Sequence, residues 1–291
     1  MNRRNFLKTG VLFGAGSFVF RSNYTGKIFI TDDYEIKKCR KKLSSLDLNL
    51  KDKNIDYIIP EIGKSFIGTE YVAGTLDVNT KKEELVIKIT GLDCVTFVEN
   101  TLVMSRLIQK NDTSFEAYKN ELTLIRYRKG IIDGYTSRLH YFTDWIYDNQ
   151  QKGIVKDVTE EIGGIPYDKT INFMSTHKKS YKQLLENSDY VDDIKETESE
   201  ITKRNKFYIP KNKVDKYYDY LKTGDIIATT TEIDGLDVTH TGFIYKENEE
   251  TYFMHASIVK KEVTISNVQL KEYLLSNKKQ SGIIVSRPQN I

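Results

Sequence analysis

Apolar residues in the first half of the chain recur every three or four positions, as they do on the buried face of an amphipathic helix. The helices predicted from this spacing cover residues 32–46, 51–66, 93–109, 114–125 and 137–150. Pro60 should kink or restart the second of them, because proline lacks the N–H that a helix interior needs. A short apolar run at 84–89 precedes the third helix and predicts a strand.

Beyond Gly153 the apolar and polar positions alternate over short runs, which is typical of strands. The predicted strands cover residues 157–162, 170–174, 206–209, 224–229, 237–245, 251–257, 261–266 and 282–287. Residues 177–204 interrupt this series with a highly charged helical pattern, and we expect an insertion packed on one side. Helices followed by strands predict an α+β domain with N-terminal helices and a C-terminal antiparallel sheet.

A cysteine stands at the junction of the predicted strand 84–89 and the helix that follows it. Gly91 provides a turn, Asp93 is a suitable N-cap, and Cys94 falls in the first helical turn. Free N–H groups at a helix start, together with a neighbouring histidine, lower the pKa of a thiol, so we expect a thiolate nucleophile. Taken alone, a cysteine among apolar residues is more often an inert small hydrophobe, so the assignment requires a base nearby.

Two of the four histidines, His240 and His255, lie in consecutive predicted strands joined by a polar run at 246–250. If the turn is centred on residues 248 and 249, the histidines are diagonal neighbours on one face. A change of one residue in loop length would separate them. Cys94, a histidine base and a residue that orients the base are the three parts of a thiol hydrolase. His255 by itself reads equally well as a half-buried strand residue.

Three segments, residues 66–76, 92–100 and 137–145, together with the two histidine strands, resemble a known family. They are similar to the NlpC/P60 cysteine hydrolases of bacterial peptidoglycan and, more narrowly, to the DUF1460 branch, which is N-acetylmuramoyl-L-alanine amidase-like. The resemblance implies a papain-like core with family-specific helical insertions. Glu70 departs from the pattern, because the family often has a proline at that position.

The resemblance also implies the roles of individual residues. Cys94 would be the nucleophile, His240 the general base and His255 the residue that orients it. The implied substrate-binding residues are Tyr71, Asp93, Tyr135, Ser137, Arg138, His140 and Tyr141. The implied partners are peptidoglycan fragments (muropeptides), cut between N-acetylmuramic acid, in its 1,6-anhydro form, and L-Ala. Neither a metal nor another cofactor is expected.

The segment around Arg138 is the expected place of substrate selection. An arginine at a helix start can bind a muropeptide carboxylate bidentately, while tyrosines pack on a sugar ring. The alternative is that Arg138 and the tyrosines only close the domain surface. Trp145 and Phe142 have the spacing of core residues, whereas His177 and Ser175 are further candidates for the cleft lining.

Three other functions remain open. An endopeptidase cutting the γ-D-glutamyl-diamino acid bond would keep the fold and change the bond. A non-catalytic wall-binding module would keep the fold and lose the chemistry. A metallohydrolase built on His140, His177, His240 and His255 is disfavoured, because no pair of them has the spacing of metal ligands.

The formal charge of +3 and the pI near 8.5 come from the first 22 residues. Arg3, Arg4, Lys8 and Arg21 lie there with no acid, and without them 40 basic residues face 41 acidic ones. No nucleic-acid partner is therefore expected. The arginine pair ahead of the apolar run at 9–20 predicts an export signal over 1–22, of the twin-arginine or Sec type, and a periplasmic protein.

The alternative to export is an amphipathic start that packs on the domain. The apolar run is too short and too rich in glycine for a spanning helix, so no transmembrane helix is expected in the mature chain. Residues 23–291 should form a single domain. Cys39, in a run of lysines and arginines, is expected to be an incidental surface or half-buried thiol.

Overall fold

The computed structural model describes residues 32–77 and 82–291, so the expected export segment lies outside the described residues. The α-helices are α1 (Asp33–Ser44), α2 (Ile55–Lys64), α3 (Cys94–Gln109), α4 (Phe115–Arg126), α5 (Phe142–Gln151), α6 (Phe173–Thr176), α7 (Lys182–Glu186), α8 (Asp189–Lys203) and α9 (Leu270–Ser276). Short 3₁₀ helices are η1 (Leu48–Leu50), η2 (Arg128–Gly130), η3 (Tyr135–Ser137), η4 (Lys178–Ser180) and η5 (Val214–Tyr220).

The strands are β1 (Glu70–Tyr71), β2 (Gly91–Leu92), β3 (Val155–Asp157), β4 (Ile165–Pro166), β5 (Phe207–Pro210), β6 (Ile226–Thr231), β7 (Val238–Glu247), β8 (Glu250–Ser257), β9 (Glu262–Ile265) and β10 (Gln280–Pro288). They form one mixed sheet in the order β2-β1-β9-β8-β7-β6-β10-β5-β4, and β3 also pairs with β10. The central strands β9-β8-β7-β6-β10 are antiparallel. The α+β class and the C-terminal antiparallel sheet are therefore confirmed.

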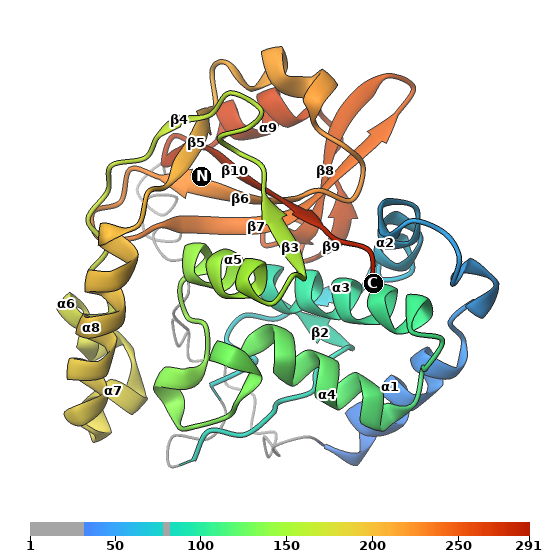
Figure 1. Cartoon of the computed structure of the whole chain (residues 1–291), viewed down its shortest axis with the longest axis horizontal. Helices are drawn as coiled ribbons and strands as arrows, with labels where there is room; N and C mark the ends of the chain where they lie inside the picture. The colour runs from blue at the N-terminus through green and yellow to red at the C-terminus, as the bar shows by residue number, and fades with distance from the viewer. Residues whose placement is uncertain (1–31, 78–81) are drawn as a thin grey trace, which may run out of the picture.

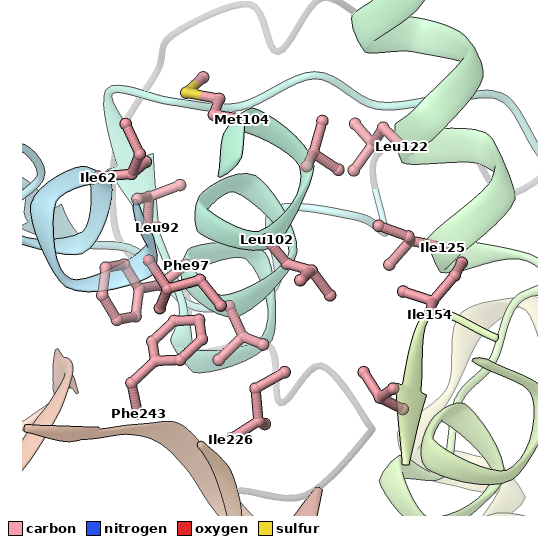
Figure 2. Close-up of a cluster of buried hydrophobic side chains, with 14 of the residues drawn as sticks. Ile62, Leu92, Phe97, Leu102, Met104, Leu122, Ile125, Ile154, Ile226 and Phe243 are labelled. Atoms are coloured by element: carbon pink, nitrogen blue, oxygen red, sulfur yellow. The ribbon is translucent and has the colours of Figure 1, made fainter. Parts of the chain in front are cut away.

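Helices cover the central sheet on both faces. Figure 1 shows α3, α4 and α5 on one side of β6, β7 and β10, with α9 on the other. The larger core lies under α3. There the rings of Phe97 and Phe243 meet edge to face, with their centroids 5.7 Å apart. Figure 2 shows this pair with its apolar neighbours. The opposite face of β7 and β8 carries Ile244 and Phe253, which pack with Leu270 and Leu274 of α9.

The segment 84–89 is not a strand, although its apolar run predicted one. Side chains from distant helices satisfy its backbone in place of a neighbouring strand. Arg126 donates to the carbonyl of Val86, and Asn100 donates to the carbonyl of Lys88. The buried carboxylate of Glu35 in α1 accepts from the N–H groups of Ile89 and Thr90, at 3.0 and 3.3 Å. The strand before Cys94 is reduced to β2.

Three further predicted bounds are wrong. The helix expected at 137 begins at Phe142, because Ser137 directs its hydroxyl to the carbonyl of Gly134 within η3 instead of capping a helix. The strand expected over 170–174 is a single bridge from Ile171 to Gly235, followed by α6. The strand expected over 157–162 ends at Asp157. Helix α2 continues through Pro60 without interruption.

The charged segment 177–204 forms η4, α7 and α8, as predicted. Helices α7 and α8 contribute to a separate apolar cluster with Tyr135, Tyr141 and Phe173. Figure 1 shows α6, α7 and α8 together at one side of the domain. Among the described residues, no helix has the length and apolar character that crossing a membrane requires.

Cys39 is fully buried, which corrects the expectation of a surface or half-buried thiol. Although lysines and arginines surround it in sequence, its own position on α1 faces the core with Leu43. Burial raises the pKa of the Cys39 thiol to about 12, so this thiol is neutral and unreactive at physiological pH.

Candidate active site

A cavity at the N-terminal end of α3 brings together residues from distant parts of the sequence. The candidate residues that line it are Tyr71, Asp93, Cys94, Tyr135, Arg138, His140 and His240. They come from β1, the start of α3, the η3 turn with the segment after it, and β7. Most of the expected site is therefore gathered around the Cys94 thiol.

Cys94 is the first residue of α3, and Asp93 is its N-cap, as predicted. The Asp93 carboxylate accepts from the N–H of Thr96 at 2.8 Å, and the Thr96 hydroxyl accepts from the N–H of Asp93 at 2.9 Å. This reciprocal capping box satisfies two backbone donors of the first turn and fixes the direction in which α3 begins. Asp93 therefore holds the cysteine in place as well as lining the cavity.

The expectation of a Cys94 thiolate is wrong. Burial raises the pKa of the Cys94 thiol to about 12, and the neighbouring Asp93 carboxylate raises it further. Backbone N–H groups of Thr241, Val95 and Cys94 itself lower this pKa but do not offset the two raising effects. The free site therefore holds a neutral thiol, whose sulfur lies against the N–H of Thr241, the residue after His240.

His240 and His255 meet as the hairpin geometry predicted. The turn is centred on Asn248 and Glu249, which both have positive φ, at 51° and 67°. The resulting register places Nε2 of His240 2.7 Å from Nδ1 of His255. Within the described residues, Nδ1 of His240 is buried without a hydrogen-bond partner. One nitrogen of His240 is thus oriented by His255, and the other remains available.

Burial lowers the pKa of His240 to about 4 and holds the pKa of His255 well below its usual range. Aromatic rings enclose His255. Phe253 stacks on it with the ring centroids 4.6 Å apart, and Tyr273 of α9 meets it edge to face with the centroids 5.0 Å apart. Both histidines are therefore neutral near pH 7, the form in which an imidazole can accept a proton.

The body of α3 packs on the face of β7 opposite to the histidines. Phe97 contacts Phe243, which lies on one face of β7. Ile244 and the Cα of Gly242 lie on the other face. Only the first two turns of α3 reach the cavity, and at the start of the helix Cys94 meets the part of β7 that carries His240.

Tyr71 stands next to Cys94 through strand pairing. β1 is parallel to β2, with Tyr71 opposite Leu92, so Tyr71 lies beside the turn into α3. Burial raises the pKa of the Tyr71 hydroxyl, and the nearby Cys94 and Asp93 add to the rise. Tyr71 is a neutral phenol on the cavity wall.

Arg138 lies in the cavity wall, but carboxylates already occupy its guanidinium. It is 6% exposed; Nη2 lies 2.5 Å from the Asp77 carboxylate and Nε lies 3.2 Å from that of Glu83. These partners are distant in sequence, so no local pattern signalled the pairing. Binding of a substrate carboxylate by this arginine would require breaking a buried ion pair.

Four other expected residues lie elsewhere. Ser137 faces a different surface depression, beside Thr136 and Asp193. Tyr141 is buried under the 177–204 insertion, where its hydroxyl donates to Glu198 and accepts from the N–H of Met174. His177 packs on Phe173, and the N–H of Ser175 donates to Glu198, so neither lines the cavity.

Sequence reasoning missed several residues of the site. Glu99 and Arg126 line the cavity as an ion pair with 2.7 Å between Nη2 and Oε2, and Asp77 lies beside Arg138. Tyr273 supports His255 from α9. The predicted helix over 93–109 carries both Cys94 and Glu99 and could have suggested Glu99. No local sequence pattern pointed to Tyr273 or Asp77. Over the part of the chain that is described, no three His, Cys, Asp or Glu side chains cluster as metal ligands would.

Comparisons with known proteins show which family the chain resembles. A family described as AmiA-like, N-acetylmuramoyl-L-alanine amidase-like, matches residues 61–283. A crystal structure of an N-acetylmuramoyl-L-alanine amidase from Bacteroides uniformis is 37% identical, with a TM-score of 0.75 over 81% of this chain and 99% of that one. No functionally curated protein matches the chain.

Two further solved structures are similar. A Bacteroides fragilis protein described provisionally as a xylanase is 36% identical, with a TM-score of 0.73 over 78% of this chain and 99% of that one. A Legionella pneumophila protein assigned to DUF1460 is 22% identical, with a TM-score of 0.66 over 87% of this chain and 94% of that one. At 22% identity, this last similarity shows only that the two proteins share a fold.

Proposed function

This chain belongs to the N-acetylmuramoyl-L-alanine amidase-like family, and we propose that it hydrolyses the bond between N-acetylmuramic acid and L-Ala with Cys94 as the nucleophile. One observation carries the proposal. Cys94 heads α3 in the cavity that His240 lines, and the 2.7 Å contact with His255 leaves Nδ1 of His240 unoccupied. The fold is then that of a papain-like NlpC/P60 hydrolase.

The reaction starts from a neutral thiol and a neutral imidazole. Nδ1 of His240 takes the thiol proton as the Cys94 sulfur attacks the amide carbonyl, while Nε2–H of His240 donates to Nδ1 of His255. Backbone N–H groups at the start of α3 stabilise the oxyanion. The carbon–nitrogen bond breaks, and His240 gives its proton to the leaving amine of L-Ala. Water, deprotonated by His240, then hydrolyses the thioester and restores the thiol.

The proposed substrate is a free muropeptide, with the 1,6-anhydro sugar preferred. The test is to incubate the full chain with anhydro and non-anhydro muropeptides and to identify the products by mass. An intact stem peptide beginning with L-Ala supports the amidase, and faster release from the anhydro form supports the preference. A product that begins at the diamino acid identifies the endopeptidase instead.

The two cysteines provide a matched pair of variants. Cys94→Ala should abolish turnover while leaving the substrate Kd within a few-fold, because the thiol supplies covalent chemistry and not binding energy. Cys39→Ala should retain turnover, since that thiol is buried in the core. Residual turnover in Cys94→Ala above a tenth of wild type would overturn the nucleophile. Tight binding without hydrolysis by the wild-type chain would identify a wall-binding module.

The xylanase description of the B. fragilis relative does not suit this cavity. Glycosidases need two carboxyl groups, one of which protonates the leaving oxygen. The carboxylates in the cavity wall are engaged otherwise: Asp93 caps α3, Asp77 pairs with Arg138, and Glu99 pairs with Arg126. Amide hydrolysis by the thiol uses none of them.

We also propose that the protein acts after export to the periplasm, directed by residues 1–22. The basic start and the apolar run at 9–20 support this. Fractionation of cells that express the full chain, with N-terminal sequencing of the mature form, tests it. Recovery of an uncut chain in the cytoplasm would exclude export.

A further inference from the structure

We propose that His140 determines specificity by accepting a hydrogen bond from an O–H or N–H group of the substrate's sugar, and that this wall of the cavity does not bind stem-peptide carboxylates. The inference rests on the proposed amidase function and adds the chemistry of one subsite. It replaces the expectation that the segment around Arg138 recognises a carboxylate.

The proton of His140 has a fixed position. Nε2 lies 2.8 Å from the carbonyl oxygen of Tyr135, and a carbonyl can only accept, so Nε2 carries the hydrogen. The imidazole is neutral, because burial and the nearby Arg138 guanidinium hold its pKa well below the usual range. A neutral ring with its hydrogen on Nε2 has a lone pair on Nδ1, which is therefore an acceptor.

That acceptor is available to a ligand. His140 lines the cavity that contains Cys94, and its ring is held by Tyr135 with the ring centroids 4.3 Å apart. Among residues 32–77 and 82–291, no group hydrogen-bonds to Nδ1, and this atom is not among the fully buried unpaired ones. The missing donor must therefore come from the solvent or from a bound molecule.

The charges around His140 select the kind of donor. The neighbouring Arg138 is neutralised by Asp77 and Glu83, so the wall offers no free positive charge. A carboxylate placed here would meet the Nδ1 lone pair and two carboxylates. Hydroxyl and acetamido groups of a muramoyl sugar are neutral donors and suit the site, which places the sugar on the His140 side of Cys94.

The test uses three substrates without any ammonium group. They are anhydro-N-acetylmuramoyl-L-Ala-D-Glu, the same compound with both D-Glu carboxyl groups converted to amides, and lactoyl-L-Ala-D-Glu. The last compound keeps the scissile bond and lacks the sugar. We expect His140→Ala to lower kcat/KM about three- to tenfold for both sugar substrates, as loss of a neutral hydrogen bond implies. With the lactoyl substrate, the variant and the wild type should be equal.

Two variants make the result specific. His140→Asn can place an oxygen near the position of Nδ1 and should recover part of the loss, whereas His140→Phe keeps the ring and should not. His177→Ala is the matched control, because this histidine also contacts a backbone carbonyl but lies outside the cavity. If His140→Ala fails to fold, the comparison of His140→Asn with His140→Phe decides.

Two outcomes overturn the inference: a loss confined to the acid and absent with the amide, or an equal loss with the lactoyl substrate. The same contrast is measured as Kd on the Cys94→Ala background. Failure of the wild type to cut the muramoyl bond would thus refute the proposed function, while the Kd values still decide on His140.

Discussion

The Cys94 and His240 pair is neutral in the free site, and this is the main chemical consequence of its burial. The surrounding protein removes water from the half-buried Cys94 thiol and from the buried His240 imidazole, which disfavours both charged forms. In the proposed mechanism the proton therefore moves during the attack on the substrate, instead of having moved beforehand. A neutral thiol is also less prone to adventitious alkylation and oxidation, because the thiolate is the reactive form.

The pH profile of kcat/KM should reflect this pair. Protonation of His240, whose pKa is lowered to about 4, removes the base, so activity should hold from neutral pH down to about pH 5 and fall near pH 4. Initial rates between pH 3.5 and 9 test this, with circular dichroism at each pH to verify folding. An acid limb near the ordinary histidine value of 6.5 would contradict it.

The two histidines should differ in their tolerance of substitution. His240→Ala removes the base and should be nearly as inactive as Cys94→Ala. His255→Asn should retain more activity, because an amide oxygen can still accept from Nε2 of His240 and orient that ring. Steady-state kinetics on the three variants tests the assignment. Greater loss in His255→Asn than in His240→Ala would mean that the roles are exchanged.

At the scale of elements, local signals predicted the parts of the site that local interactions form. The Asp93 cap and the Asn248–Glu249 turn involve neighbouring residues only, and both are confirmed. The segment 84–89 was wrongly predicted as a strand because the partners of its backbone, Glu35 and Arg126 among them, are far away in sequence. The ion pairs of Arg138 were not predicted for the same reason, since its partners Asp77 and Glu83 are equally remote.

Glu35 provides a test of how α1 supports the site, although α1 lies outside the family match over 61–283. Glu35→Ala would leave the N–H groups of Ile89 and Thr90 without their acceptor, at a cost of roughly 1–3 kcal/mol per buried group. Because these residues lead through β2 into Cys94, kcat should fall together with the free energy of unfolding. Urea unfolding and kinetics measure both effects.

The control for Glu35 is Asp33→Ala, which removes an exposed acid from the same helix. It should change neither kcat nor the free energy of unfolding beyond about 0.5 kcal/mol, as is usual for surface substitutions. Unchanged stability and kcat in Glu35→Ala would show that the segment 84–89 does not depend on α1.

At the scale of the whole molecule, the buried histidines link stability to pH. The folded pKa of His240 lies below its unfolded value, so between pH 6.5 and about 4 the unfolded chain binds more protons and stability falls as the pH falls. The loss from His240 alone is about 3 kcal/mol at pH 4, at 1.36 kcal/mol for each pKa unit. Buried carboxyls with raised pKa values, such as Asp237, act in the opposite direction.

The difference between wild type and His240→Gln isolates the histidine from those carboxyls. Glutamine does not titrate, so the free energy of unfolding of the variant should decline less between pH 7 and pH 4. Urea denaturation at both pH values measures it. Parallel declines in the two proteins would mean that His240 is not buried in its neutral form.

Of the described strands, β10 comes last in the sequence, and it completes the sheet. β10 lies between β6 and β5 and also pairs with β3, and Figure 1 shows it passing through the middle of the sheet. During synthesis, β6 and β5 therefore leave the ribosome with open edges and wait for the segment Gln280–Pro288. Open edges of this kind recruit other chains. A nascent chain stalled before Gln280 should depend on chaperones.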